Sequence, residues 1–391
     1  MPEQCILVIN TGSSSLKFGL YAENDGDEQV LLDGLADGIG QSSGTLEIKD
    51  GIGKTVRSEK VSFASRHDAL SHAAKWLDEL APGKPYAIGH RVVHGGPRLV
   101  KHQRITPDLV GELKACVHFA PLHIPMALQL IAEAERAYPD VPQFACFDTA
   151  FHCTMPETAA RFPVSRSLFD EGIRRYGFHG LSYESIVYQL GDKLPGRVVM
   201  AHLGSGASLV AVKDGKSVDT SMGLTPTGGI PMATRTGDLD PGVLLYLQRA
   251  KHMDADALEK LLNRDAGLAA LSGGTSDMRK LQLAADQGNR NAELAIEVFC
   301  LAIRKFVAAY AAVLGGLDML ILAGGIGERS ANVRGGVCEG LRFCGVTLDN
   351  QKNQANAPTI SDATSAVEVR IVASQEDRQI ARHCRAMMHQ G

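Results

Sequence analysis

The stretch ILVINTGSSSLKF, residues 6–18, is the most informative part of this chain for its fold. The aliphatic run from Cys5 to Ile9 has the pattern of a buried strand, and an asparagine with a Gly/Ser cluster follows it directly. Small residues let a backbone approach a ligand, and backbone N–H groups and hydroxyls donate hydrogen bonds to anionic oxygens. The segment therefore predicts a strand, a phosphate-binding loop and a second strand.

The same pattern returns in VVMAHLGSGASLVAV, residues 198–212. Aligning Asn10 on His202 brings the two Gly-Ser pairs into register. Either segment alone is equally well interpreted as an ordinary β-hairpin with a Gly/Ser turn. Two such units nearly half a chain apart indicate a duplicated fold that holds nucleotide phosphates between its halves.

The size and composition are typical of a globular protein. The chain has 391 residues, enough for two domains with their own cores, and it is 45% hydrophobic and 21% charged. A net charge of −4 and the lack of an aromatic-studded basic stripe disfavour a nucleic-acid partner. The eight cysteines include no C-x-x-C pair and lie in apolar segments, which is typical of reduced thiols in the cytoplasm.

Neither a secretory signal nor a membrane partner is expected. The first apolar run, CILVI, is too short for a signal peptide and no basic residues precede it. Residues 306–326 are apolar enough to resemble a membrane span, but Gly315, Gly316 and Asp318 interrupt them. A helix that ends at the paired glycines, followed by a buried strand, explains this segment better.

Strands and helices alternate along two regions, which predicts two α/β domains. The first covers residues 1–148 and the second residues 149–375, and the terminal helix, about residues 376–391, is expected to pack back on the first domain. The expected strands are 6–9, 16–21, 143–147, 198–203, 207–213, 319–323 and 367–373. The expected helices are 68–80, 123–137, 239–250, 254–262, 289–314 and 376–388.

Two common nucleotide-binding motifs are absent. The tripeptide GKT at residues 53–55 has Ile48 where the upstream glycine of a Walker A loop belongs, and it lies in a polar hairpin region. The glycine spacing of a Rossmann fingerprint is also missing. A third Gly-rich turn, AGGIGERS at residues 323–330, is expected between a strand and a helix, as either a nucleoside-binding surface or a tight connection.

Several charged or polar residues stand in chemically suggestive places. Arg91 and Arg235 lie in Gly-rich, otherwise uncharged segments, where a planar cation suits a carboxylate or a transferring phosphoryl group; a surface arginine is the alternative. Asp148 directly follows a strand, and Glu376 starts the last helix. Either would hold Mg²⁺ through water, or Glu376 only caps its helix. His179 lies in YGFHG, where small neighbours are expected to leave its ring accessible.

Ordered motifs over nearly the whole chain resemble those of the acetate kinase family, which shares its fold with sugar kinases, Hsp70 and actin. They are NTGSSSLK (10–17), GHRVVHGG (89–96), APLH (120–123), FDTAFH (147–152), YGFHG (176–180), HLGSGAS (202–208), ATRTGDLDPG (233–242), SDMR (276–279), GGIGE (324–328) and QED-x-x-IAR (375–382). The resemblance implies a duplicated ribonuclease-H-like fold with the active site in the interdomain cleft. It also implies a homodimer and reversible in-line phosphoryl transfer between ATP and acetate, giving acetyl phosphate and ADP. The implied cofactor is Mg²⁺, for which Mn²⁺ would substitute.

The resemblance assigns roles residue by residue. Arg91 and Arg235 would bind the carboxylate and the phosphoryl group in flight, and His179 would hydrogen-bond that phosphoryl group. Asp148 would orient the nucleophile or the metal, and Asn10 and Glu376 would hold the metal. The acyl pocket would be formed by Val93, Leu122, Phe178 and Pro226. The nucleotide and its phosphates would be bound by Asn10, Ser13, Ser15, Lys17, His202, Leu203, Gly204, Ser205, Gly206, Asp277, Met278, Arg279, Gly324, Gly325, Ile326 and Gly327.

Two alternatives to an acetate kinase stay open. Val93 indicates a tight acyl pocket that favours acetate, but the loop near Pro226 departs from the family's common sequence, so a propionate kinase is the nearest alternative. One methylene changes discrimination by only about 1–3 kcal/mol. An actin- or Hsp70-like nucleotide switch would leave Arg91 and Arg235 without a purpose.

Overall fold

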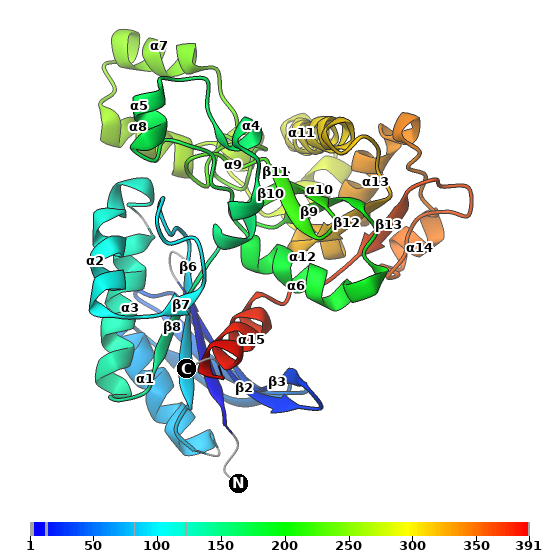
Figure 1. The fold of residues 1–391 in the computed structure, drawn as a ribbon. Helices are drawn as coiled ribbons and strands as arrows, with labels where there is room; N and C mark the ends of the chain where they lie inside the picture. Colours follow the sequence, from blue (N-terminus) through cyan, green and yellow to red (C-terminus); the bar gives the residue numbers. More distant parts are fainter. Residues whose placement is uncertain (1–3, 12–14, 82, 122, 390–391) are drawn as a thin grey trace. The chain divides into compact units, whose positions relative to one another are not determined.

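The computed structural model describes residues 4–11, 15–81, 83–121 and 123–389 (Figure 1). The chain divides into two compact units. Unit 1 comprises Met1–Ala150, Gly180–Ser185 and Gln375–Gly391, and unit 2 comprises Phe151–His179 and Ile186–Ser374. Within the described ranges, none of the helices combines the length and the apolar character that crossing a membrane requires.

Unit 1 is built on an eight-stranded sheet. Its strands are β1 (Ile6–Thr11), β2 (Ser15–Asn24), β3 (Asp27–Asp37), β4 (Gly44–Asp50), β5 (Thr55–Val61), β6 (Ala87–Val92), β7 (Gln103–Arg104) and β8 (Gln143–Phe147). They are ordered β5-β4-β3-β2-β1-β6-β8-β7. Its helices are α1 (Arg66–Leu80), α2 (Pro107–Ala115), α3 (Ile124–Ala137), the start of α6 (Gly180–Leu190) and α15 (Glu376–Met388).

Unit 2 is built on a five-stranded sheet. Its strands are β9 (Arg197–Leu203), β10 (Ala207–Lys213), β11 (Lys216–Thr220), β12 (Met319–Ala323) and β13 (Glu368–Ile371), in the order β11-β10-β9-β12-β13. Its helices are α4 (Glu157–Ala160), α5 (Arg166–Asp170), the end of α6, α7 (Pro241–Lys251), α8 (Ala255–Arg264), α9 (Gly267–Ser272), α10 (Met278–Asp286), α11 (Arg290–Leu314), α12 (Gly324–Arg329), α13 (Ala331–Glu339) and α14 (Asn350–Gln354).

One strand order occurs in both sheets. The run β3-β2-β1-β6-β8 in unit 1 corresponds to β11-β10-β9-β12-β13 in unit 2. In each run the first three strands are antiparallel neighbours, and the last two strands run parallel to the third. The repeated order confirms the predicted α/β class and the duplicated, ribonuclease-H-like plan.

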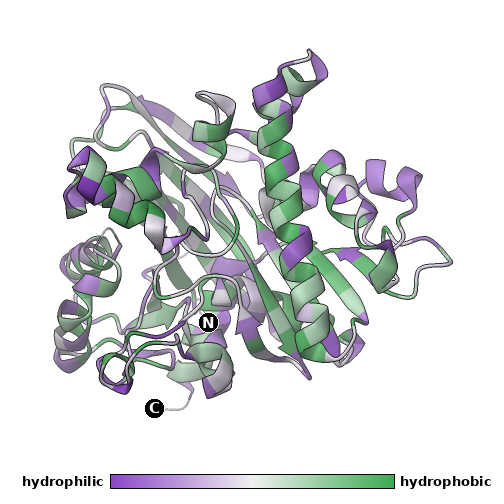
Figure 2. Cartoon of the chain, turned by 90° about the horizontal axis from the view of Figure 1, so that it is seen from above, coloured by the Kyte–Doolittle hydropathy of each residue, from purple (hydrophilic) through white to green (hydrophobic). Residues whose placement is uncertain are grey.

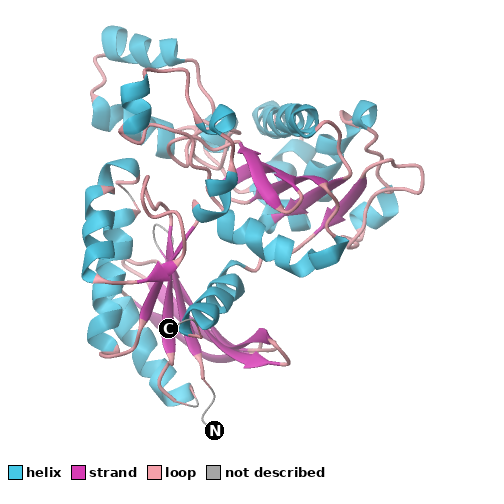
Figure 3. Cartoon of the chain, in the orientation of Figure 1, coloured by secondary structure: helices cyan, strands magenta, loops and turns pink. Residues whose placement is uncertain are grey.

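Both faces of the sheet are buried at β1. Successive side chains of a strand point to opposite faces, so neighbouring residues of β1 belong to different cores. Leu7 and Ile9 pack in the core that includes residues of α1 and α3. Ile6 and Val8 pack in a second core with Ile380 of α15. Helices α1 to α3 therefore cover one face of this sheet and the terminal helix covers the other (Figures 1 and 3).

The longest helix, α11, explains the apolar segment at residues 306–326. From Ala292 to Leu314 its buried residues recur every three or four positions, apart from the adjacent Phe299 and Cys300, and Figure 2 shows both hydrophobic and hydrophilic residues along it. The helix ends at Gly315, whose φ of 72° is in the left-handed region, and the fully buried strand β12 follows. The prediction of a helix end and a buried strand is confirmed.

One local prediction is wrong. The glycines of AGGIGERS do not form a turn between a strand and a helix, because Gly324–Arg329 is itself the short helix α12, directly after β12. Glycine has low helix propensity, so its density there pointed to a loop. Tertiary packing overrides that preference: a Cβ atom on Gly324 would lie 2.7 Å from the carbonyl oxygen of Leu203.

Candidate functional site

Arg91 and Asp148 form a partly buried ion pair at the carboxyl ends of two parallel strands. Arg91 lies near the end of β6, paired in register with Cys146 of β8, and Asp148 follows β8 directly. The guanidinium Nε and Nη2 donate to the Asp148 carboxylate, at 3.1 Å to Oδ1 and 2.7 Å to Oδ2. Burial opposes the charged guanidinium, but Asp148 and Glu376 outweigh that effect and raise the pKa of Arg91. Arg91 is thus a fixed and permanent positive charge.

The remaining side of Arg91 faces two predicted metal ligands. Its Nη1 donates to Asn10 Oδ1 at 3.3 Å and lies 3.6 Å from Glu376 Oε2. Asn10 ends the apolar part of β1, and Glu376 is the first residue of α15. The structure therefore brings Asn10, Arg91, Asp148 and Glu376 together within unit 1. It also gives Asp148 a definite contact, since both of its carboxylate oxygens accept hydrogen bonds from Arg91.

Asp377, which was not among the predicted site residues, completes this network. Its carboxylate accepts from Asn10 Nδ2 at 2.8 Å and lies 2.8 Å from the ammonium of Lys17. Asn10 and Lys17 are directly opposite each other in the β1–β2 ladder, so both reach the same carboxylate. Asp377 raises the pKa of Lys17 more than burial lowers it. The signal for Asp377 was its position beside Glu376 in the first turn of the last helix.

The charges of this network leave room for a cation. Arg91 and Lys17 are balanced against three carboxylates, those of Asp148, Glu376 and Asp377. Carboxylate and amide oxygens are the donors that Mg²⁺ prefers. The donor set around Asn10 and Glu376 therefore fits a magnesium ion.

Two histidines and a tight turn form a second cluster, within unit 2. Residues 204–206 join β9 and β10, and the N–H of Gly204 donates to the carbonyl of Gly206 at 3.0 Å. The ring of His179 stacks on His202 at 4.4 Å, and its Nδ1 lies 2.8 Å from the hydroxyl of Ser208. His179 is 8% exposed, so the prediction of an accessible ring is wrong: its neighbours in sequence are small, but strands β9 and β10 cover it.

Arg235 approaches the same turn. A Cβ atom on Gly206 would lie 3.3 Å from His179 Nε2 and 3.7 Å from Arg235 Nη1. Arg235 Nη1 also donates to the carbonyl of Pro226 at 3.1 Å. The backbone of residue 206 is thus the point on which a histidine and an arginine converge, as a phosphoryl-binding site requires.

Further predicted nucleotide residues gather at the same edge of the sheet. Strands β9 and β12 are parallel neighbours, with Ala323 opposite His202, so Leu203 and Gly324 meet where both strands end. His179, which precedes α6, has a φ of 59°, which is strained for a residue with a side chain. The carboxyl ends of strands are where ligands of α/β proteins bind.

Asp277 to Arg279 have a structural explanation of their own. Asp277 is the N-cap of α10, accepting from the backbone of Arg279 at 2.9 Å, and it pairs with the Arg279 guanidinium at 2.8 Å. These hydrogen bonds lower the pKa of Asp277 to about 2. Met278 is buried at the start of the helix. Their nucleoside-binding role stays a prediction.

The predicted acyl-pocket residues are only partly described. Val93 follows β6 in unit 1 and is half-buried. Phe178 and Pro226 are buried in unit 2. Leu122, like the predicted phosphate ligand Ser13, lies outside the described residues, whereas Ser15 begins β2.

Comparison with known proteins gives one family. The model of the acetokinase family matches residues 5–382. The acetate kinase of Methylocella silvestris is 43% identical over 402 residues, covering 99% of this chain and 98% of that protein. A propionate kinase of Francisella tularensis has a solved structure that is 36% identical with a TM-score of 0.93, covering 98% of this chain and 100% of that chain. The crystal structure of Porphyromonas gingivalis acetate kinase, with the same coverage, is 34% identical with a TM-score of 0.88.

Proposed function

We propose, from the premise that this chain belongs to the acetokinase family, that it catalyses reversible phosphoryl transfer between ATP and acetate, giving acetyl phosphate and ADP. The observation that carries the proposal is the guanidinium of Arg91, clamped by Asp148 at the end of two parallel strands. A carboxylate substrate is already ionised at neutral pH. Its phosphorylation therefore needs alignment and charge neutralisation rather than a general base.

Each unit would supply a different part of this chemistry. In unit 1, Arg91 would bind the carboxylate and the transferring phosphoryl group. In unit 2, Arg235 and His179 would donate to a phosphoryl group beside Gly206, where a Cβ atom would lie 3.3 Å from His179 Nε2. Ser208 would fix the orientation of the His179 ring, because its hydroxyl lies 2.8 Å from Nδ1.

Mg²⁺ is the cofactor that the residues of unit 1 fit. Asn10 and Glu376 would hold it, directly or through water, and Asp377 would hold Asn10 in place through the 2.8 Å hydrogen bond. When bound, the ion would neutralise phosphate charge. All eight cysteines are free thiols, which supports a cytoplasmic location, and a homodimer follows from the family resemblance.

Acetate is the proposed acceptor, with propionate as the second candidate. The Francisella tularensis relative named a propionate kinase is the observation that favours propionate. The half-buried Val93 favours acetate, because a smaller side chain there would leave space for another methylene. The difference between the two acids is expected to be modest, about 1–3 kcal/mol for one methylene.

The test is an acyl phosphate assay. The protein is incubated with ATP, Mg²⁺ and acetate, propionate or butyrate, and the product is trapped with hydroxylamine. We expect a hydroxamate signal with the highest kcat/KM for acetate, and a Val93→Ala variant should shift the ratio toward propionate. Absence of hydroxamate with all three acids would refute the proposed function. A higher kcat/KM for propionate would replace acetate as the acceptor.

A further inference from the structure

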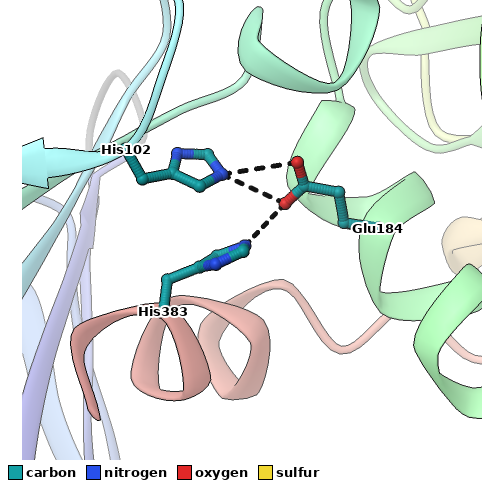
Figure 4. Close-up of side chains that lie close together, drawn as sticks. All are labelled: His102, Glu184 and His383. Atoms are coloured by element: carbon teal, nitrogen blue, oxygen red, sulfur yellow. Dashed lines mark hydrogen bonds and ion pairs between the residues drawn. The ribbon is translucent and has the colours of Figure 1, made fainter. Parts of the chain in front are cut away.

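Three side chains from distant parts of the chain meet within unit 1. His102 precedes β7, Glu184 lies on α6 and His383 lies on α15. The Glu184 carboxylate lies 3.3 and 3.2 Å from His102 Nε2 and 2.7 Å from His383 Nε2 (Figure 4). The two imidazole rings lie 4.1 Å apart. We call these three residues the His-Glu-His cluster.

The spacing of this cluster would suit a metal ion, since the three ligand atoms lie within 4.8 Å of one another. The hydrogen bonding of His102 argues against a metal. The backbone N–H of Phe147 donates to His102 Nδ1 at 3.0 Å, so Nδ1 carries the lone pair and Nε2 carries the proton. Histidines that bind metals through one ring nitrogen almost always donate from the other. Instead, His102 is oriented to donate its Nε2–H to Glu184.

The partners of the cluster are neighbours of the proposed catalytic groups. Phe147, which donates to His102, is followed in the chain by Asp148. The first residue of α6, Gly180, donates its N–H to the carbonyl of Asp148 at 2.9 Å. Ser185, the residue after Glu184, accepts from the N–H of Gln375 at 3.1 Å, just before Glu376. The segment Gly180–Ser185 is therefore bonded both to the end of β8 and to the start of α15.

We propose that Glu184 is a positioning residue, which acts through His102 and His383 to hold Asp148, just after β8, and the start of α15 at a fixed separation. This inference rests on the proposed function, because Asp148 orients Arg91 and Glu376 is a metal ligand only in that reaction. The cluster places the Glu184 carboxylate between His102, which accepts from Phe147 at the end of β8, and His383, which lies on α15. Burial disfavours ionised Glu184, but its hydrogen bonds to both histidines outweigh burial and lower its pKa to about 2.

Glu184→Gln tests the proposal, because it keeps the shape of the side chain and removes its charge. We expect kcat to fall and the Mg²⁺ concentration for half-maximal rate to rise, each by about tenfold, the lower end of the effect of residues that directly orient metal ligands. The KM for ATP should stay within about twofold, because the proposed nucleotide residues lie mostly in unit 2. Hydrogen exchange should become faster at residues 147–148 and 376–380.

Asp27→Asn is the matched control. Asp27 pairs with Arg382 of α15 at 2.8 Å, so this variant loosens the same helix without touching the cluster. It should change neither kcat nor the Mg²⁺ dependence. If Glu184→Gln does not fold, His383→Gln replaces it, since that side chain is 25% exposed.

Three outcomes would overturn the inference. One is a folded Glu184→Gln protein with unchanged kcat, Mg²⁺ dependence and exchange. Another is equal losses in Glu184→Gln and Asp27→Asn, which would mean that any anchor of α15 has the same effect. The third is a stoichiometric metal in the purified wild-type protein that is lost in Glu184→Gln. The exchange measurement does not depend on activity. A wild type that forms no acyl phosphate would refute the proposed function, whereas unchanged exchange at residues 147–148 and 376–380 in Glu184→Gln would refute the positioning role.

Discussion

Arg91 owes its proposed role to the shape of its guanidinium as well as to its charge. Lysine would keep the charge but would lose the paired donors to Asp148. We expect Arg91→Lys to lower kcat/KM for acetate by about 10²-fold or more, as for the loss of one preorganised donor to a transition state. Acyl phosphate formation measures the effect.

The matched control for Arg91→Lys is Arg197→Lys. Arg197 also pairs with a carboxylate through Nε and Nη2, at 3.1 and 2.5 Å from Asp318 Oδ1, but this pair lies on the surface at the start of β9. Its loss should leave kcat/KM unchanged. Equal activity in wild type and Arg91→Lys would show that any cation suffices at this position.

His90, next to Arg91, makes stability depend on pH. Burial lowers its pKa to about 4, more than the hydrogen bond to Gln143 raises it. Between about pH 4 and 6.5 the unfolded chain therefore binds the proton and the folded chain does not. Stability should fall as the pH drops through this range, by on the order of 3 kcal/mol in total.

Urea unfolding at about pH 7 and about pH 5 tests this, with His90→Gln as the variant that cannot titrate there. The wild type should lose on the order of 2 kcal/mol more than the variant between these two conditions. An equal loss in both proteins would show that His90 binds its proton in the folded state.

Single residues were predictable where a motif surrounds them and not where the fold alone brings them together. Arg91 and Asp148 stand out because each follows or ends a strand pattern. Ser208 has no such signal, because it contacts His179 only after β10 has paired with β9. Glu184 has no such signal either, because it is one charged residue on α6, a helix outside the predicted ranges.

At the scale of elements, the stability of α12 depends on Gly324 more than on the neighbouring glycines. Gly324 has a φ of 73°, and a Cβ atom there would lie 2.7 Å from the carbonyl oxygen of Leu203. Gly324→Ala should lower the free energy of unfolding by about 2–4 kcal/mol, since neither the backbone conformation nor β9 can accept a side chain. Thermal or urea unfolding measures the change.

Gly325 is the control within the same helix. It is exposed, and a Cβ atom on it would meet nothing within 4 Å. Gly325→Ala should therefore raise stability by about 0.5–1 kcal/mol through helix propensity. If a nucleoside lies directly on the backbone of α12, the added methyl group should weaken ATP binding relative to the wild type, even though the variant is stable. Calorimetry measures this affinity. Destabilisation by Gly325→Ala would contradict the proposed difference between the two glycines.

At the scale of the whole molecule, the duplicated strand order was predictable because the two Gly/Ser hairpins carry the same sequence pattern. The arrangement of β1, β2, β9 and β10 follows from it. The last helix was harder to place, since α15 is separated from β1 by most of the chain. Only tertiary packing shows that Asp377 contacts Asn10, residues 367 positions apart.

The return of α15 to unit 1 makes that unit depend on the last residues of the chain. Ile380, Ala381 and Cys384 are fully buried against β1 and its neighbours. Arg385 pairs with Glu28, which is 2% exposed. A chain that ends at Ser374 would expose one face of the sheet of unit 1 and leave the buried carboxylate of Glu28 without Arg385. We expect this to lower the free energy of unfolding of unit 1 by on the order of 5 kcal/mol.

Limited proteolysis of this truncated chain should therefore show rapid cleavage within residues 4–150, while fragments of unit 2 persist, because α15 belongs to unit 1. A chain that ends at Met388 is the control and should resist like the full chain, since the next residue, His389, is exposed. Acyl phosphate formation should vanish in the first chain, which lacks Glu376 and Asp377. If the residues before 150 stayed protected without α15, the sheet of unit 1 would be stable with one face uncovered, and the proposed dependence would be wrong.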